Sequence, residues 1–234
     1  MEPAPQQIKT KTAAERSQEK QSKIKRKRAL WLSIAGVVIA LDQLSKWYVT
    51  EIFLRPRFMA GESVDLINWY INTPSPLRGG GIYMTSFFNL VMAWNTGVSF
   101  SMFSGQGFYT WLFLIVVALG ITCGFLYWMW NEKRHIFGIC YALVIGGALG
   151  NVIDRVRFGA VIDFLDFHIF GHHWPAFNVA DMAVVTGISL LIIVSLFFDI
   201  TTKDRYRKRK KKERHMKKML FKRFGATHII TRKK

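Results

Sequence analysis

Residues 146–181 decide the fold, and they read GGALGNVIDRVRFGAVIDFLDFHIFGHHWPAFNVAD. Apolar runs of hydrocarbon length lead into and out of this stretch. Between them lie its four aspartates, two arginines and two asparagines, which are Asp154, Asp163, Asp166, Asp181, Arg155, Arg157, Asn151 and Asn178. Ionisable groups beside membrane-spanning segments are costly and are usually functional. We therefore interpret the rest of the chain as the means of fixing this cluster at one face of a membrane.

Charge and apolarity are segregated along the chain. Half of the 234 residues are hydrophobic, yet the formal net charge is +18. The basic residues gather in 9–28 and 203–234, whereas the apolar residues fill the middle. This pattern is typical of a membrane protein with basic tails and argues against a soluble basic domain. We predict a basic cytoplasmic tail (1–28), one membrane domain (29–199) and a second basic cytoplasmic tail (200–234).

Four apolar runs are long enough to cross a membrane as helices, which takes about 20 residues each. They are residues 29–49, 107–130, 136–153 and 178–199. The first run is not a cleaved signal peptide, because it is long for one and carries Asp42 and Lys46. The fold class predicted is an all-α membrane protein with four transmembrane helices and a small periplasmic extended or β cradle.

Residues 51–106 form the predicted insertion at the periplasmic face. Its first part, 51–88, is polar and rich in proline and glycine, and the alternation in 63–71 suggests short strands. Residues 89–103 are apolar but interrupted by polar residues, so we expect extended chain at the membrane face. The polar residues 1–28 cannot bury a core, and we expect no regular structure there.

Orientation follows from the distribution of positive charge. With an inner N-terminus, the inner segments 1–28, 131–135 and 200–234 hold 27 of the 33 lysines and arginines. The positive-inside rule then places both termini in the cytoplasm. The polar cluster between the third and fourth helices consequently lies at the outer face.

Two local spacings suggest functional roles, and each also has a structural explanation. Asp42 and Lys46 are four residues apart on one helix face, as a structural ion pair or as a brace for the site. Asn178 and Asp181 are placed to cap the fourth helix. If Asp163 lies opposite Asp181, however, the two carboxylates share one proton and can activate water. The residues alone do not choose two aspartates out of four.

Other chemistries fit less well. The sequence has no His-Glu-x-x-His zinc helix and no Gly-x-Ser-x-Gly elbow. A zinc site at His168, His172 and His173 is disfavoured, because histidines in a loop near a membrane are commonly polar interface residues. Cys123 and Cys140 are expected to be packed thiols, and Gly146 and Gly150 allow close helix contact. We expect no metal and no cofactor.

Four blocks in order resemble the lipoprotein signal peptidase family. They are Asp42-Gln-Leu-Ser-Lys46, Asn95-Thr-Gly97-Val-Ser-Phe100, Gly146-Gly-Ala-Leu-Gly-Asn151 with Asp154-Arg155, Gly159 and Asp163-Phe164, and Trp174-Pro-Ala-Phe-Asn178-Val-Ala-Asp181. The resemblance implies a four-helix aspartic endopeptidase of the bacterial inner membrane. It would remove the signal peptide from prolipoproteins by cutting before the diacylglyceryl-modified cysteine.

The resemblance also assigns residues. It places the catalytic pair on Asp163 and Asp181, and the supporting residues on Asp42, Lys46, Asn95, Gly97, Asn151, Arg155 and Asn178. Asn95 and Arg155 would hold the substrate backbone, while Asn151 and Asn178 would orient the catalytic pair. We interpret Asp154 as structural and leave Asp166 without a role. The implied partners are diacylglyceryl-prolipoproteins and membrane lipids, the chain is expected to be a monomer, and nucleic-acid binding is disfavoured.

Two features depart from the shared pattern. The segment 51–88 is longer than the family core, and Val98-Ser99 stand where the family often has alanines. The basic tails either contact anionic lipid at the inner face or fix the topology. Rival functions are a small transporter or lipid-binding subunit that uses the polar cluster as an ion site, and, more weakly, a scaffold for a soluble partner.

Overall fold

The computed structural model describes residues 12–58, 62–72, 80–97 and 107–224, with the side chains of 107–109, 198–209 and 221–224 excepted. The chain forms two compact units, Met1–Ser189 and Leu190–Lys234. The first unit holds the polar cluster and the sheet. The second continues a helix that begins in the first.

The described residues contain four helices that are long and apolar enough to cross a membrane, as predicted. Helix α1 (Ala13–Trp47) continues through the π-helix η1 (Tyr48–Leu54) into α2 (Arg55–Phe58). The others are α4 (Gly107–Asn131), α5 (His135–Phe158) and α6 (Val179–Phe224). Helix α5 runs past its predicted end and stops at Gly159, whose left-handed φ of 74° is the conformation in which glycine commonly ends a helix.

The expectation that residues 1–28 lack regular structure is wrong for residues 13–28. Helix α1 begins at Ala13 with a capping box, in which Thr12 and Glu15 each accept a hydrogen bond from the backbone of the other. An ion pair of 2.7 Å between Glu19 and Lys23 adds support one turn later. Helix α6 likewise continues to Phe224 instead of ending at 199. Local capping and charge pairing therefore extend α1 into its basic segment.

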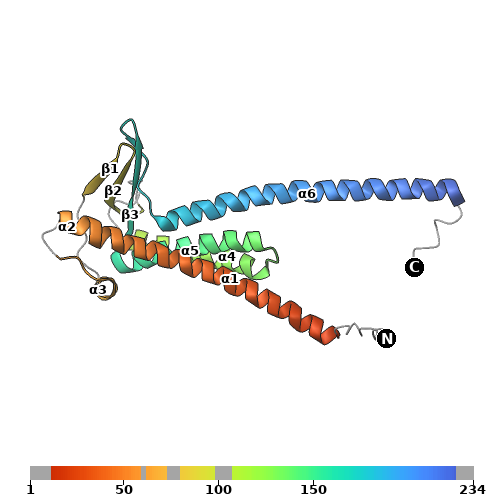
Figure 1. The fold of residues 1–234 in the computed structure, drawn as a ribbon, viewed down its shortest axis with the longest axis horizontal. Coiled ribbons are helices and arrows are strands. Elements are labelled where there is room, and N and C mark those ends of the chain that lie inside the picture. Colours follow the sequence, from red (N-terminus) through yellow and green to blue (C-terminus); the bar gives the residue numbers. More distant parts are fainter. Residues whose placement is uncertain (1–11, 59–61, 73–79, 98–106, 225–234) are drawn as a thin grey trace, which may run out of the picture. The chain divides into compact units, whose positions relative to one another are not determined.

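Helix α5 packs between α1 and α4 in the first unit (Figure 1). Glycines allow this approach, as predicted for Gly146 and Gly150. A Cβ added at Gly150 would lie 2.8 Å from the Asp42 carboxylate, and one added at Gly146 would lie 2.8 Å from Ala35 O. Gly147 faces the backbone of α6 in the same way. Both cysteines are free; Cys140 is buried as expected, whereas Cys123 is exposed.

A small antiparallel sheet covers one end of these helices (Figure 1). Its described strands are β1 (Gly81–Thr85), β2 (Phe88–Asn95), β3 (Val161–Ile169) and β4 (His172–His173), in that order across the sheet. The predicted cradle is thus a sheet, and residues 89–95 are extended as expected; residues 98–103 of that prediction lie outside the described residues. The β2–β3 register places Ala93 opposite Asp163 and Asn95 opposite Val161. The sheet therefore brings two distant parts of the chain to the same point.

The strands predicted in 63–71 are wrong, because α3 (Leu66–Ile71) is a helix. Asp65 caps it by accepting a hydrogen bond of 3.0 Å from the Asn68 backbone. Trp69 is 1% exposed and packs in a core cluster with Leu54, Leu90, Ile162 and others. N-cap chemistry and one buried indole outweigh the apolar alternation that suggested strands.

Candidate active site

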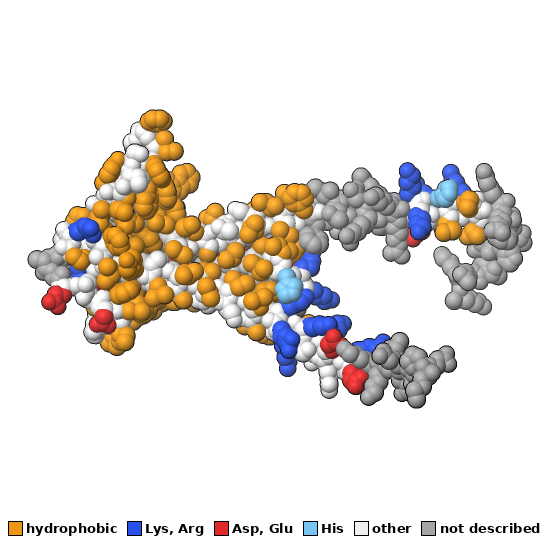
Figure 2. Space-filling view, in the orientation of Figure 1, with side chains coloured by type: hydrophobic (Ala, Val, Ile, Leu, Met, Phe, Trp, Pro, Cys, Tyr) orange, Lys and Arg blue, Asp and Glu red, His pale blue; other side chains and the backbone are white. Residues whose placement is uncertain are grey.

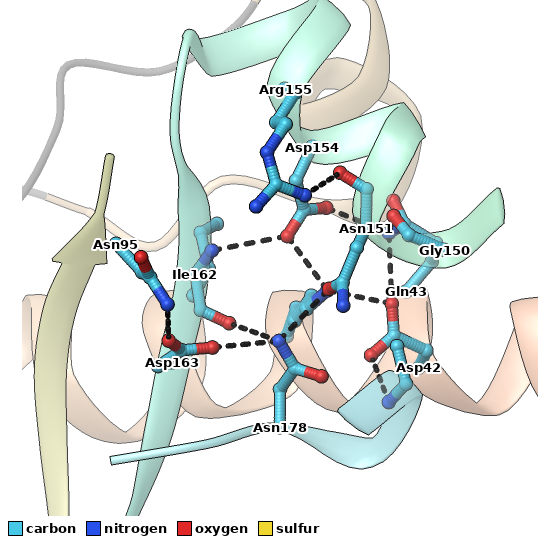
Figure 3. A network of polar contacts seen from close by, with 12 residues as sticks. Asp42, Gln43, Asn95, Gly150, Asn151, Asp154, Arg155, Ile162, Asp163 and Asn178 are labelled. Atoms are coloured by element: carbon cyan, nitrogen blue, oxygen red, sulfur yellow. Dashed lines mark hydrogen bonds and ion pairs between the residues drawn. The ribbon is translucent and has the colours of Figure 1, made fainter. Parts of the chain in front are cut away.

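Asp163 lies on β3, and amide groups hold both of its oxygens. The Asn95 side chain on β2 donates to Oδ2 at 3.0 Å, and Asn178 Nδ2 donates to Oδ1 at 2.7 Å. The residue is only 2% exposed. Figure 3 shows Asp163 between Asn95 and Asn178. Three separate segments of the chain therefore fix one buried carboxyl group.

Asp181 lies in the first turn of α6 and is part of a reciprocal cap. Its backbone N–H donates to Asn178 Oδ1 at 2.9 Å, and its Oδ2 accepts from the Asn178 backbone at 3.3 Å. The predicted capping arrangement is confirmed. The other carboxylate oxygen accepts from Asn151 Nδ2 at 2.8 Å, so the carboxylate has a partner on α5 as well.

Asn178 and Asn151 connect the two aspartates. Asn178 Nδ2 donates to Asp163, and also to Asn151 Oδ1 at 3.1 Å. Asn151 Nδ2 in turn donates to Asp181. Asn178 is fully buried, and a buried amide with all of its partners in place holds a fixed orientation. The structure thus brings Asp163 and Asp181 into one hydrogen-bonded group.

A buried ion cluster supports this group from α1. Lys46 Nζ lies 2.7 Å from Asp42 and 2.7 Å from Asp154, and all three side chains are inaccessible. Lys46 also donates to Asn151 Oδ1 at 3.4 Å. The predicted Asp42–Lys46 ion pair is therefore present, and it also braces an asparagine that holds Asp181.

The two acids of the ion cluster extend it to neighbouring elements. Asp42 accepts from the Ala180 backbone at 2.9 Å, at the start of α6. Asp154 accepts from the Ile162 backbone at 3.1 Å, next to Asp163 (Figure 3). Each acid thus ties a helix to one of the two segments that carry the aspartate pair, which agrees with the structural role predicted for Asp154.

Arg155, Asn95 and Gly97 lie around the aspartate pair. The Arg155 guanidinium donates to Asn151 O at 3.4 Å, and its charge interacts with the carboxylates of Asp181 and Asp163. The Asn95 amide is engaged at both ends, because its Oδ1 accepts from Gly97 N at 2.8 Å. Gly97 has a φ of 78°, which other residues rarely adopt. These two bonds use one of the two N–H groups of the Asn95 amide and one of the two lone pairs of its oxygen.

Asp163 has an unusual acidity. Burial raises its pKa from 3.8 to about 7, hydrogen bonding from Asn95 opposes the rise, and the charge of Asp181 adds to it. Near neutral pH the group therefore exists in both protonation states. A carboxyl group of this kind can serve as an acid while a neighbouring carboxylate serves as a base.

Asp166 lies on the same strand in a different environment. Asn89 Nδ2 donates to it at 2.9 Å, and His173 Nδ1 lies 2.9 Å from each of its oxygens. Hydrogen bonds from these two residues outweigh the effect of burial and hold the pKa of Asp166 below its ordinary value. Asp166 therefore belongs to a hydrogen-bonded group on β2, β3 and β4, apart from the aspartate pair.

The three histidines expected in a loop lie on strands, His168 on β3 and His172 and His173 on β4. Among the described residues, no group of three or more histidines, cysteines and acidic residues is placed to hold a metal ion. His168 and His173 instead stack with ring centroids 4.7 Å apart. Their geometry is that of polar residues at the edge of the sheet.

Four residues around the ion cluster were given no role by sequence reasoning, namely Gln43, Tyr70, Arg157 and Trp69. Gln43 donates to Asp154 at 2.8 Å and accepts from the Tyr70 hydroxyl of α3 at 3.0 Å. Arg157 stacks on Trp69 with its Cζ 4.0 Å from the ring centroid, and it donates to the Trp69 backbone at 2.5 Å. Gln43 follows Asp42 in the first of the four blocks that carry the family resemblance, which was its one available signal. The α3 contacts had none, because α3 was not recognised as a helix.

The buried polar residues of the described chain gather near the sheet end of the helices. The buried charged residues are Asp42, Lys46, Glu51, Arg55, Asp154, Asp163 and Asp166. Within the described parts of α4 the buried polar side chain is Thr122. A transporter would be expected to carry polar groups along a path across the bilayer, and this one-sided grouping does not favour that alternative.

Comparison with known proteins gives a consistent match. Residues 34–197 match the family model described as Signal peptidase (SPase) II. The chain is 42% identical over 171 residues to the lipoprotein signal peptidase of Ralstonia nicotianae, covering 71% of this chain and 83% of that one. It is 39% identical over 166 residues to the lipoprotein signal peptidase of a Janthinobacterium strain, covering 69% and 85%.

Solved structures give the same picture. The chain resembles a bacterial membrane enzyme determined in meso at 2.3 Å resolution, with a TM-score of 0.54 and 26% identity, covering 75% of this chain and 92% of that one. A second in meso structure of a bacterial membrane enzyme, at 1.9 Å resolution, has a TM-score of 0.54 and 27% identity, covering 72% and 93%.

Proposed function

The chain belongs to the signal peptidase II family, and on this premise we propose that it is an aspartic endopeptidase that cuts prolipoproteins before the diacylglyceryl-modified cysteine. Membership of this family indicates a protease that removes signal peptides from prolipoproteins. The aspartic mechanism and the cleavage position are the parts that we add.

One observation carries the proposal. Asp163 and Asp181 come from a strand and a helix N-terminus that are separate in the sequence, and they meet through the amides of Asn178 and Asn151. Helix capping alone explains Asp181, and strand pairing alone explains Asn95. Neither explains why a buried carboxyl group on β3 is oriented by the residue that caps α6.

The geometry supports a general acid–base mechanism. The first turn of α6 stabilises negative charge at Asp181, which then takes a proton from water. Asp163, with its pKa near 7, donates its proton to the oxygen of the scissile carbonyl. The hydroxide formed from the water bonds to the carbonyl carbon and gives a gem-diol. The C–N bond then breaks as the proton held by Asp181 passes to the leaving amine, and one gem-diol hydroxyl returns a proton to Asp163, so that both aspartates regain their starting states. Arg155 is placed to bind the substrate backbone, while Asn151 and Asn178 orient the two acids.

The substrate enters this site from the bilayer. A signal peptide and two acyl chains are apolar, and the site lies where the apolar helices α1 and α5 and the start of α6 meet β3. We propose that this is the outer face of the bacterial inner membrane, with both termini cytoplasmic, because the positive-inside rule places the basic segments inside. The proposed enzyme acts as a monomer without a metal or cofactor.

The decisive experiment is cleavage of a diacylglyceryl-modified prolipoprotein by purified protein in detergent. We expect the folded Asp163→Asn and Asp181→Asn variants to be inactive, because the amide keeps the size but cannot exchange a proton. Asp166→Asn is the matched control on the same strand and should cut. If Asp163→Asn cuts well, the catalytic pair is misassigned, and Asp154 is the next candidate to replace. Loss of activity with a chelator and recovery with zinc would contradict the metal-free mechanism.

A further inference from the structure

A cavity lies near the start of α1, far along this helix from the residues that support the aspartate pair. It has a volume of about 860 Å³ and is formed by the first turns of α1 together with the turn between α4 and α5. Binding pockets for small molecules commonly have volumes of about 300–1,000 Å³. We propose that this cavity binds the headgroup of an anionic phospholipid. The proposal does not depend on the peptidase activity.

The lining is strongly basic. It includes six basic side chains and two acidic ones, a net charge of +4 with His135 neutral; the basic ones are Arg16, Lys20, Lys23, Arg26, Lys27 and Lys133. Both acids already have cations, because Glu19 pairs with Lys23 at 2.7 Å and Glu132 pairs with Arg134 at 3.0 Å. An additional anion would therefore meet mainly positive charge.

Two of the cations are available for a ligand. Lys20 and Arg26 are exposed, and within the described residues neither has a hydrogen bond or an ion pair with a neighbouring side chain. Lys27 donates to Lys133 O at 3.0 Å, which fixes the helix against the α4–α5 turn while leaving its charge facing the cavity. Arg28 similarly donates to Trp130 O at 2.6 Å. Lys27 and Arg28 thus hold α1 against the α4–α5 turn, while Lys20 and Arg26 remain available to bind an anion.

The cavity lies at the level of lipid headgroups. On α1 the sequence changes from basic to apolar between Arg28 and Ala29, and Trp130 stands beside Arg28 with its ring centroid 4.3 Å from the guanidinium carbon. Tryptophan at such a boundary is typical of the membrane interface. Figure 2 shows the basic side chains gathered where the hydrophobic surface of α1 ends.

The occupant is a lipid in preference to a free anion, because the cavity borders exposed apolar surface. Leu30 lines it and is 49% exposed, and Leu32 and Val37 continue the exposed apolar surface of α1, at 44% and 56%. An acyl chain can lie along these residues while its phosphate contacts Lys20 and Arg26. Basic pockets at the cytoplasmic ends of membrane helices bind lipid headgroups in this way.

The test is a titration of the full-length protein in neutral detergent, with bound lipid counted by native mass spectrometry. The probes are short-chain phosphatidylglycerol, phosphatidylcholine with the same chains, and inorganic phosphate. We expect phosphatidylglycerol to saturate one site and phosphatidylcholine to bind more weakly. The double variant Lys20→Gln with Arg26→Gln should weaken phosphatidylglycerol binding by about tenfold or more, given about 1 kcal/mol per basic residue.

The control removes the same charge elsewhere. Lys25→Gln with Lys212→Gln changes one residue on α1 outside the cavity lining and one on α6, and it should leave the affinity within about threefold. Unfolding temperatures of both variants establish that they are folded. Equal losses in the two variants would show general electrostatic attraction and overturn the proposal. Competition by inorganic phosphate at the same concentration as the lipid, or equal binding of the two lipids, would also overturn it.

Discussion

At the scale of single residues, the two aspartates of the proposed catalytic pair differ in what surrounds them. Asp163 is buried on a strand and receives two amide hydrogen bonds, whereas Asp181 is half-buried and lies at a helix N-terminus. The difference separates an acid from a base without any difference in residue type. Two predictions test whether these surroundings set the chemistry.

Removing the Asn95 hydrogen bond should change the pH dependence of cleavage. If protonated Asp163 is the acid, kcat/KM falls as pH rises through about 7. The Asn95 bond lowers the pKa of Asp163, so Asn95→Ala should move this decline to higher pH. Asn89→Ala, which removes a bond to Asp166 instead, should leave it in place. A decline that stays fixed in Asn95→Ala would show that Asp163 does not govern this limb.

The same acidity has a consequence for stability. An unfolded aspartate ionises above its ordinary pKa of 3.8, while folded Asp163 keeps its proton up to about 7. The stability that Asp163 contributes is therefore complete below 3.8 and is lost as pH rises to about 7. Asp163→Asn cannot ionise, so its unfolding temperature should rise relative to the parent across this range. A constant difference would mean that Asp163 is not protonated in the folded protein.

At the scale of elements, α3 is the part that the sequence described least well. Tyr70 bonds Gln43 on α1, and Arg157 on α5 stacks over Trp69 and Tyr70 at 4.0 and 4.3 Å. These contacts connect α3 to the ion cluster that supports Asn151. Helix α3 is thus linked to the surroundings of the aspartate pair through these polar side chains, in addition to the packing of Trp69 against Leu90 and Ile162 of the sheet.

Tyr70→Phe should loosen α3 without unfolding the protein. The loss of one neutral hydrogen bond costs about 1 kcal/mol, so hydrogen exchange of residues 66–71 should accelerate by about fivefold if it proceeds by local opening. Ile71→Val changes the outer face of the same helix, where Ile71 is 71% exposed, and should have little effect. Equal exchange in Tyr70→Phe and the parent would show that the Tyr70–Gln43 bond does not hold α3.

The sequence predicted the elements that depend on local properties and missed those that depend on contacts between distant residues. Hydropathy found the four long helices, because membrane length and apolarity are local properties. It missed α3, whose helical structure depends on the Asp65 cap and on the burial of the Trp69 indole. It also missed the helical start of α1. Asp163 was chosen over Asp154 and Asp166 only through resemblance, because its link to Asn178 depends on the packing of β3 against the start of α6. Gln43 and Arg157 act through tertiary contacts that no spacing indicated.

At the scale of the whole molecule, the ion cluster of Lys46, Asp42 and Asp154 is the junction that joins α1, α5, β3 and α6. A buried ion pair contributes little net stability compared with apolar residues, but the loss of one partner leaves an uncompensated charge. We therefore expect the free energy of unfolding to fall most when one member of the cluster is removed and the others stay charged.

Lys46→Met should be among the most damaging single substitutions, because it leaves two buried carboxylates without their cation. We expect a loss of about 3–5 kcal/mol in the free energy of unfolding, measured by denaturation in mixed micelles. Adding Asp42→Asn and Asp154→Asn to Lys46→Met should recover much of that stability. Lys25→Met, on the exposed start of the same helix, is the control. A Lys46→Met protein as stable as this control would contradict the role of the cluster.

The ion cluster also constrains how the protein is made. Helix α1 carries Asp42 and Lys46 four residues apart, so it can enter the bilayer with its charges already balanced. The cation that pairs with Asp154 in the described structure comes from α1, and an unpaired aspartate in a membrane helix costs up to about 3 kcal/mol. Glycosylation tagging should therefore show that α5 integrates less efficiently when α1 is deleted, and that Asp154→Ala removes the deficit. In this sense α1 serves as an intramolecular chaperone for α5.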